Sequence, residues 1–189
     1  MMEKLFITAE ELLKSSFELG LKIFESGFNP THVVGIWRGG ATVGIAVHEI
    51  LDLLGVHTEH FAIRTSSYKG INNQSNEVKI FGLGQVIDTI SSDSKVLLVD
   101  DIFDTGRSVK VTIEAIKKGA KLSKPCEIKV ATVFYKPEKN KTEREPNYFI
   151  HKTDAWAVFP HEMVGCTLDE IMEKKPVPER IFKILKGTG

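Results

Sequence analysis

The sequence has few of the features that mark secreted or membrane proteins. It has only two cysteines, Cys126 and Cys166, among 189 residues. Two such distant cysteines predict reduced cytosolic thiols, because disulfide frameworks and zinc sites need more cysteines at regular spacings. No apolar run approaches the roughly 18 residues of a membrane span, and there is no signal-peptide pattern. We therefore expect a soluble, cytoplasmic protein.

The sequence also lacks net charge and histidine ligand spacing. Lys plus Arg is 25 and Asp plus Glu is 25. With no net positive field, binding of nucleic acid or of an anionic membrane is not expected, whereas a small phosphorylated ligand is. None of the six histidines forms a His-x-x-x-His pair, which argues against a zinc site.

The length predicts one compact domain, and the apolar pattern predicts its class. Thr8 to Glu11 has the form of a capping box at the start of a helix that ends at Gly27. Apolar, β-branched runs alternate with helical patterns in the rest of the chain, which predicts an α/β fold with a mainly parallel sheet. Predicted strands are 31–36, 58–64, 96–99 and 127–134, predicted helices are 41–54, 108–118 and 178–186, and the polar stretch 65–77 is predicted to be a mobile loop.

The most informative segment runs from Val96 to Ser108, with the sequence VLLVDDIFDTGRS. A buried strand leads through three carboxylates and a glycine into a helix. Free amides at the turn and the helix start, with nearby hydroxyls and Arg107, form a cradle for a phosphate monoester. The acids would repel that phosphate unless they bind sugar hydroxyls, a metal or a proton. A purely structural acidic turn with a helix cap is the alternative interpretation.

This segment resembles the signature of the type I phosphoribosyltransferases: an apolar strand, two acids, two spacer residues, then Asp-Thr-Gly and a hydroxyl residue. The resemblance implies a single-domain fold of that family, with a core at about 28–135 and a hood over the base formed by about 136–189 and the N-terminal segment. It also implies that phosphoribosyl pyrophosphate (PRPP) and Mg²⁺ bind at this turn.

The resemblance gives each residue of the signature a role. Asp100 and Asp101 would bind the ribose hydroxyls, partly through magnesium. Asp104 would be the catalytic carboxylate beside the purine N7, where it accepts or stabilises a proton as N9 attacks the anomeric carbon. Nearby negative charge would also stabilise the oxocarbenium character of the ribose. The 5′-phosphate would be bound by Thr105, Gly106, Arg107 and Ser108.

Two further loops resemble parts of the same family. Trp37-Arg38-Gly39-Gly40 follows a predicted strand, and it resembles the pyrophosphate loop, with Arg38 and Gly39 as contacts. Ser67 and Tyr68 resemble the Ser-Tyr pair of the loop that closes over the substrates and excludes water. Alone, each would more often be an ordinary surface loop.

A third set of residues resembles the base pocket of the bacterial xanthine–guanine phosphoribosyltransferases. By this resemblance Lys136 donates to the purine O6, Trp156 stacks on the ring, and the backbone of Ala157 reads the exocyclic edge. Glu162 would help Asp100 and Asp101 to hold magnesium. Val158 is apolar where an acid would read the 2-position, which favours hypoxanthine or xanthine over guanine, although backbone carbonyls can replace such an acid.

The sequence thus predicts a purine-salvage enzyme that transfers phosphoribosyl from PRPP to N9 of a 6-oxopurine (hypoxanthine, xanthine or guanine) and releases pyrophosphate. The resemblance implies a homodimer or homotetramer. Two alternatives remain. One is a phosphoribosyltransferase for another base. The other is a non-catalytic regulator that senses PRPP or nucleotide, although Asp104 is intact and the length leaves no room for an added DNA-binding domain.

Overall fold

The computed structural model describes residues 4–69 and 76–187, with the side chains of these ranges except those of residues 67–69, 76–78 and 186–187. Its contacts divide the chain into two compact units. The larger unit is Leu13–Asp154, and the smaller unit combines Met1–Leu12 with Ala155–Gly189. Residues 136–154 belong to the larger unit, because β7 (Tyr148–Lys152) pairs with its sheet. The expected division into a core and a hood over the base stays a prediction.

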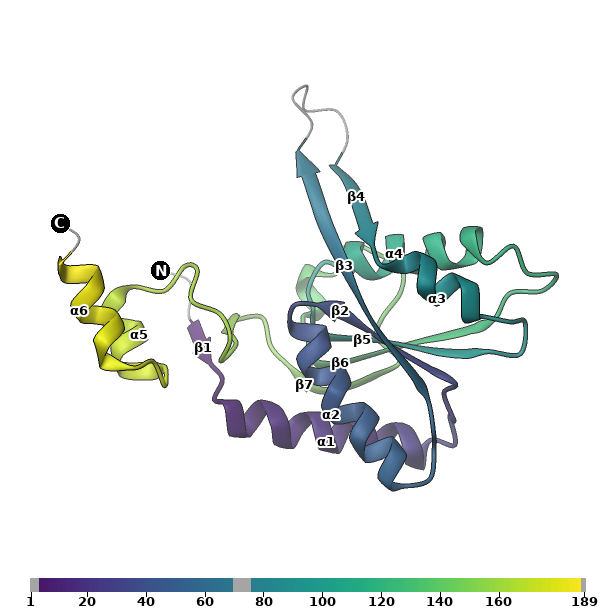
Figure 1. Cartoon of the computed structure of the whole chain (residues 1–189), viewed down its shortest axis with the longest axis horizontal. Coiled ribbons are helices and arrows are strands. Elements are labelled where there is room, and N and C mark those ends of the chain that lie inside the picture. Colours follow the sequence, from purple (N-terminus) through teal and green to yellow (C-terminus); the bar gives the residue numbers. More distant parts are fainter. Residues whose placement is uncertain (1–3, 70–75, 188–189) are drawn as a thin grey trace. The chain divides into compact units, whose positions relative to one another are not determined.

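A six-stranded sheet forms the centre of the larger unit (Figure 1). Its order is β4-β3-β2-β5-β6-β7, and every neighbouring pair is parallel except β3 and β4. This confirms the predicted α/β fold with a mainly parallel sheet. Besides β7 and most of α1 (Ala9–Glu25), this unit contains β2 (His32–Trp37), α2 (Gly39–Leu53), β3 (Glu59–Lys69), β4 (Asn76–Phe81), α3 (Leu83–Thr89), β5 (Lys95–Phe103), α4 (Arg107–Gly119), β6 (Glu127–Tyr135) and the short 3₁₀ turn Pro137–Lys139.

Helices cover both faces of this sheet. On one face, alternate residues of the buried strands, among them Val34 and Leu98, pack with Val86 of α3 and Ile113 of α4 in the main apolar core. On the other face α2 packs against β2 and β5. This arrangement places the loops after β2, β5 and β6 together at the carboxyl edge of the sheet, where parallel α/β sheets bind ligands.

The predicted start of the first helix is confirmed. In α1 (Ala9–Glu25) the Glu11 amide donates to Thr8 Oγ1 at 3.1 Å, and the Thr8 amide donates to Glu11 Oε2 at 2.8 Å. These two bonds are the predicted capping box. Gly27 has φ 74°, in the left-handed region, and follows the end of the helix as predicted.

The prediction of a loop over 65–77 is wrong at both ends. β3 continues to Lys69 and β4 begins at Asn76, and the two strands pair antiparallel, with Thr65 opposite Ile80. The hydrogen bonds of such a hairpin come from the backbone, so the strands need no apolar alternation in the sequence. Residues 70–75 lie outside the described ranges.

The smaller unit has a two-stranded parallel sheet, β1 (Lys4–Phe6) with β8 (Trp156–Val158), and two helices, α5 (Leu168–Lys174) and α6 (Glu179–Gly187). Lys4 Nζ lies 2.7 Å from Glu170 Oε2 and so links β1 to α5. The sequence predicted the last helix but missed β1, α3 and α5, which are only 3, 7 and 7 residues long. In the described ranges no helix has the length and apolar character that crossing a membrane would require.

Candidate active site

Asp100 and Asp101 lie in the last part of β5, where the strand reaches the carboxyl edge of the sheet. The Asp101 amide donates to Asp100 Oδ1 at 3.1 Å. Burial raises the pKa of Asp100, and the neighbouring charge of Asp101 raises it further. Two negative charges side by side are therefore unfavourable here, and a bound cation would relieve that repulsion.

The turn between β2 and α2 lies directly against these two acids. A Cβ atom on Gly39 would be 1.7 Å from Asp101 Oδ2, and one on Gly40 would be 2.4 Å from the carbonyl oxygen of Val99. A side chain at either position would force the turn or its neighbours to move, and these distances show that the predicted pyrophosphate loop lies against the predicted ribose-binding acids. Arg38 is exposed at the start of the turn, and the peptide bond between Trp37 and Arg38 is cis.

The turn between β5 and α4 forms a second cradle. Gly106 has φ 73° and immediately precedes the first residue of α4, Arg107. The Lys110 amide donates to the Gly106 carbonyl at 2.9 Å, which begins the helix and leaves the amides of its first turn pointing toward the loop. A small cavity of about 80 Å³ is lined by the loop, including Asp104, Thr105 and Ser108. The structure thus brings the predicted phosphate-binding residues to one cavity.

Asp104 lies at this cavity with one carboxylate oxygen unsatisfied. Its Oδ1 is buried and, among the described residues, has no hydrogen-bond partner. Lys136, at the end of β6, is buried, and its amide donates to the Phe103 carbonyl at 2.9 Å. Burial lowers the pKa of Lys136, while the charge of Asp104 opposes that shift. The predicted proton acceptor and the predicted base-reading lysine are therefore close enough to interact.

The sequence interpretation missed the segment that follows Lys136. The Lys141 amide donates to the Thr105 carbonyl at 3.0 Å. A Cβ atom on Gly106 would lie 2.7 Å from Thr142 Oγ1. These contacts place the β6–β7 connection against the turn between β5 and α4. Nothing in the charged, Pro-containing sequence of this segment points to these contacts.

Ser67 and Tyr68 lie in β3, opposite Val78 and Glu77 of β4. The structure thus places their backbone in a hairpin rather than in a loop. Their side chains lie outside the described ones, so their predicted contact with PRPP stays a prediction.

Trp156, Ala157 and Glu162 belong to the smaller unit. The Trp156 ring packs on Gly165, where a Cβ atom would lie 2.6 Å from the indole, and Lys4 Nζ lies 5.1 Å from the ring centroid. Ala157 is buried in β8. Glu162 Oε2 accepts a hydrogen bond from the Phe159 amide at 3.3 Å. These contacts show what holds each residue in its unit, and the predicted purine and metal roles stay predictions.

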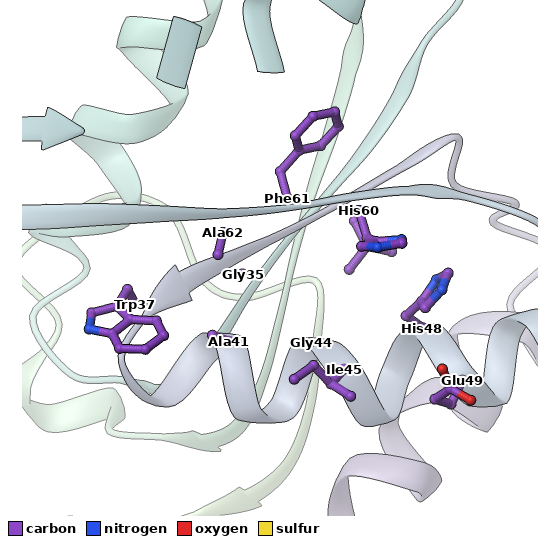
Figure 2. Close-up of a pocket in the computed structure, with 11 residues that line it drawn as sticks. Gly35, Trp37, Ala41, Gly44, Ile45, His48, Glu49, His60, Phe61 and Ala62 are labelled. Carbon is purple, nitrogen blue, oxygen red and sulfur yellow. The ribbon is translucent and has the colours of Figure 1, made fainter. Parts of the chain in front are cut away.

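A larger cavity, whose lining includes neither Asp100 nor Asp101, lies between α2 and strands β2 and β3 (Figure 2). Its volume is about 370 Å³ and most of its lining is apolar. His48 and His60 approach each other there, with ring centroids 4.5 Å apart, and Thr58 Oγ1 lies 2.9 Å from His48 Nδ1. No carboxylate pair or phosphate cradle opens into it, so the small polar cavity is the better candidate for the reaction.

The acids at the carboxyl edge fit a magnesium ion by their chemistry. Carboxylate oxygens are the hard ligands that Mg²⁺ prefers, and it usually binds through one or two of them together with substrate phosphates. Within the described part of the chain, no three His, Cys, Asp or Glu side chains form a group that could hold a metal. Asp100 and Asp101 therefore fit as the protein's share of a site that the substrate would complete.

Comparisons with known proteins agree with this geometry. The family model described as phosphoribosyl transferase domain matches residues 8–170. A hypoxanthine-guanine phosphoribosyltransferase of Lactococcus lactis is 34% identical over 150 residues, 77% of this chain and 74% of that protein. One from Streptococcus agalactiae is 30% identical over 179 residues, 93% of this chain and 90% of its own length.

A solved structure shows the same likeness in three dimensions. The purine phosphoribosyltransferase from Pyrococcus horikoshii matches with a TM-score of 0.67 and 31% identity, over 88% of this chain and 99% of that one. The resemblance stated from the sequence is thereby confirmed. Two cradles at one sheet edge, a pair of acids between them and these relatives lead to one conclusion: the chain belongs to the phosphoribosyltransferase family and is a transferase enzyme.

Proposed function

We propose that this enzyme is a purine phosphoribosyltransferase that transfers 5-phosphoribosyl from PRPP to N9 of a 6-oxopurine. The relatives named for hypoxanthine, guanine and purine support the class of base. The observation that carries the proposal is the buried, unpartnered Oδ1 of Asp104 beside a phosphate-sized cradle. A buried acceptor without a partner costs free energy, and such groups in native proteins are often functional.

The residues divide the substrate between them. Thr105, Gly106, Arg107 and Ser108 bind the 5′-phosphate through amides, hydroxyls and a guanidinium group. Arg38 and the amide of Gly39 bind the pyrophosphate. Because Gly39 touches Asp101, the leaving group and the ribose hydroxyls are held next to each other. Ser67 and Tyr68 remain proposed contacts to PRPP.

The acids serve the reaction in two ways. As pyrophosphate leaves, positive charge develops on the ribose ring, and the carboxylates of Asp100 and Asp101 stabilise it. Asp104 accepts or stabilises the proton at the purine N7 side while N9 attacks. A magnesium ion held by Asp100 and Asp101 would neutralise charge on the departing pyrophosphate. Glu162 stays a proposed further ligand.

The base is distinguished by Lys136. A buried ammonium donates hydrogen bonds and accepts none, so it suits a purine O6 carbonyl and disfavours the amino group of adenine. The proposed stacking by Trp156 and backbone reading at Ala157 rest on the family resemblance. That resemblance also supports a homodimer or homotetramer, which light scattering measures.

An activity assay tests this function. The protein is mixed with PRPP, Mg²⁺ and, separately, hypoxanthine, guanine, xanthine or adenine, and nucleotide is followed by its ultraviolet spectrum. We expect turnover with at least one 6-oxopurine and little with adenine. Asp104→Asn, which keeps the shape but not the charge, should retain PRPP binding and lose about 10²-fold or more in kcat. Turnover only with adenine would overturn the choice of base, and undiminished kcat in the variant would remove Asp104 from the mechanism.

A further inference from the structure

The β6–β7 connection is bonded to the phosphate cradle at two successive points. The Lys136 amide donates to Phe103 at 2.9 Å, before the cradle, and the Lys141 amide donates to Thr105 at 3.0 Å, within it. Both acceptors are main-chain carbonyls. The shape of the cradle therefore depends on where the connection holds these two amides.

Asn140 fixes the conformation of this connection. Its Oδ1 accepts from the Thr142 amide at 2.9 Å and lies 2.9 Å from Thr142 Oγ1. Its Nδ2 donates to the Arg144 carbonyl at 3.0 Å and lies 3.4 Å from the hydroxyl of the buried Tyr135. Asparagine suits this position because one side chain carries two donor hydrogens and an acceptor oxygen.

The bonds of Asn140 reach the cradle through its two neighbours on the chain. Lys141 carries the amide that binds Thr105. Thr142 places its hydroxyl where a side chain on Gly106 would begin, 2.7 Å from the ideal Cβ position, and that hydroxyl also lies 3.0 Å from the Arg144 carbonyl. Asn140 itself lines no part of the small cavity.

We propose that Asn140 is a positioning residue for the 5′-phosphate of PRPP. It acts through Lys141 and Thr142 on Thr105 and Gly106, and it touches no reacting atom. This inference rests on the proposed function, because it assumes that the β5–α4 turn binds the phosphate. It predicts that loss of the Asn140 side chain weakens binding of the 5′-phosphate of PRPP and leaves binding of its pyrophosphate group unchanged.

Binding of the two halves of PRPP tests the proposal, with ribose 5-phosphate and pyrophosphate titrated separately by calorimetry in the presence of Mg²⁺. In Asn140→Ala we expect the Kd of ribose 5-phosphate to rise about tenfold, because the loss of one hydrogen bond that holds the turn changes the binding free energy by about that factor. We expect the Kd of pyrophosphate to change less than about twofold. In steady state, the KM for PRPP should rise and the KM for the purine should not.

Asn147 provides a matched control. Its Oδ1 accepts from the Val130 amide at 2.9 Å, so it too supports backbone with a side-chain amide, but between strands. Asn147→Ala should lower the Tm and leave the Kd of ribose 5-phosphate unchanged. Thr142→Val, which keeps the volume and loses the hydroxyl, should reproduce part of the Asn140→Ala effect, and Thr142→Ser should restore affinity.

The outcomes separate the two claims. If Asn140→Ala and Thr142→Val both bind ribose 5-phosphate as tightly as the unaltered protein does, the inference is overturned, while the proposed function still stands. An equal loss for pyrophosphate would also overturn it, because the role would then be general stability. If the unaltered protein bound pyrophosphate but no ribose 5-phosphate, the proposed function and the inference would both fail. If Asn140→Ala does not fold, Thr142→Val gives the decisive measurement.

Discussion

The two strand–turn–helix junctions at the carboxyl edge, β2–α2 and β5–α4, look alike in sequence but need glycine for different reasons. At β2–α2 the reason is space, because a Cβ atom on Gly39 would overlap the Asp101 carboxylate. At β5–α4 the reason is partly conformation, because Gly106 has φ 73°. At β2–α2 glycine is required by the neighbouring side chain, whereas at β5–α4 it is also required by the backbone conformation of the turn itself. A glycine in a strand-to-helix turn therefore does not by itself reveal which constraint selects it.

The largest effect should come from breaking the crowded junction. In Gly39→Ala the new Cβ atom would lie 1.7 Å from Asp101 Oδ2, so either the turn or the acid must move. We expect a loss of about 10²-fold in kcat/KM, because a displacement of about 1 Å in a site has such a cost, with about 1–3 kcal/mol of destabilisation. Steady-state kinetics and denaturant unfolding measure these effects.

Gly44→Ala is the control in the same helix. Its new Cβ would lie 3.6 Å from the Cα of Gly35, an ordinary contact, so activity should be unchanged and stability should rise by about 0.5–1 kcal/mol. If Gly39→Ala and Gly44→Ala lowered kcat/KM and stability equally, α2 would tolerate no added methyl group at either position. The effect of Gly39→Ala could then not be assigned to its contact with Asp101.

An intermediate effect is expected at the second junction. Gly106→Ala meets both the positive φ and the Phe103 ring, 2.7 Å from the ideal Cβ. We expect a destabilisation of about 2 kcal/mol and a KM for PRPP that is several times higher. Gly27→Ala isolates the backbone contribution, because its φ of 74° is nearly the same and nothing lies within 4 Å of its Cβ. A Gly27→Ala loss as large as that of Gly106→Ala would mean that crowding contributes nothing there.

The smallest effect concerns the acids between the junctions. Because the pKa of Asp100 is raised on folding, the native state keeps a proton that the unfolded state releases above about pH 4. The free energy of unfolding therefore falls as the pH rises from about 4 toward the native pKa of this carboxyl. Asp100→Asn should raise the Tm at pH 7 by about 2–4 °C and lower activity. The gain in Tm should shrink toward pH 4, and thermal melts across pH measure it. A Tm gain that is the same at every pH would contradict the raised pKa.

The sequence predicted which segments meet at this edge better than the extent of the elements around it. Val96 to Ser108 was interpretable because a buried parallel strand is a continuous apolar run and a phosphate turn needs glycine and hydroxyls. The hairpin after Arg64 could not be predicted from the sequence, because its hydrogen bonds come from the backbone and its sequence is polar. The roles of Asn140 and Thr142 were equally hidden, since they depend on a chain crossing that no local pattern records.

The main-chain bond from Lys136 to Phe103 has a consequence for changing specificity. It joins the exits of two neighbouring strands without using either side chain. The spacing between position 136 and the β5–α4 turn should thus be the same for every residue at 136 except proline, which has no backbone N–H. A library of non-proline residues at that single position would vary the polarity offered at the end of β6, while the backbone distance from there to the β5–α4 turn stays the same.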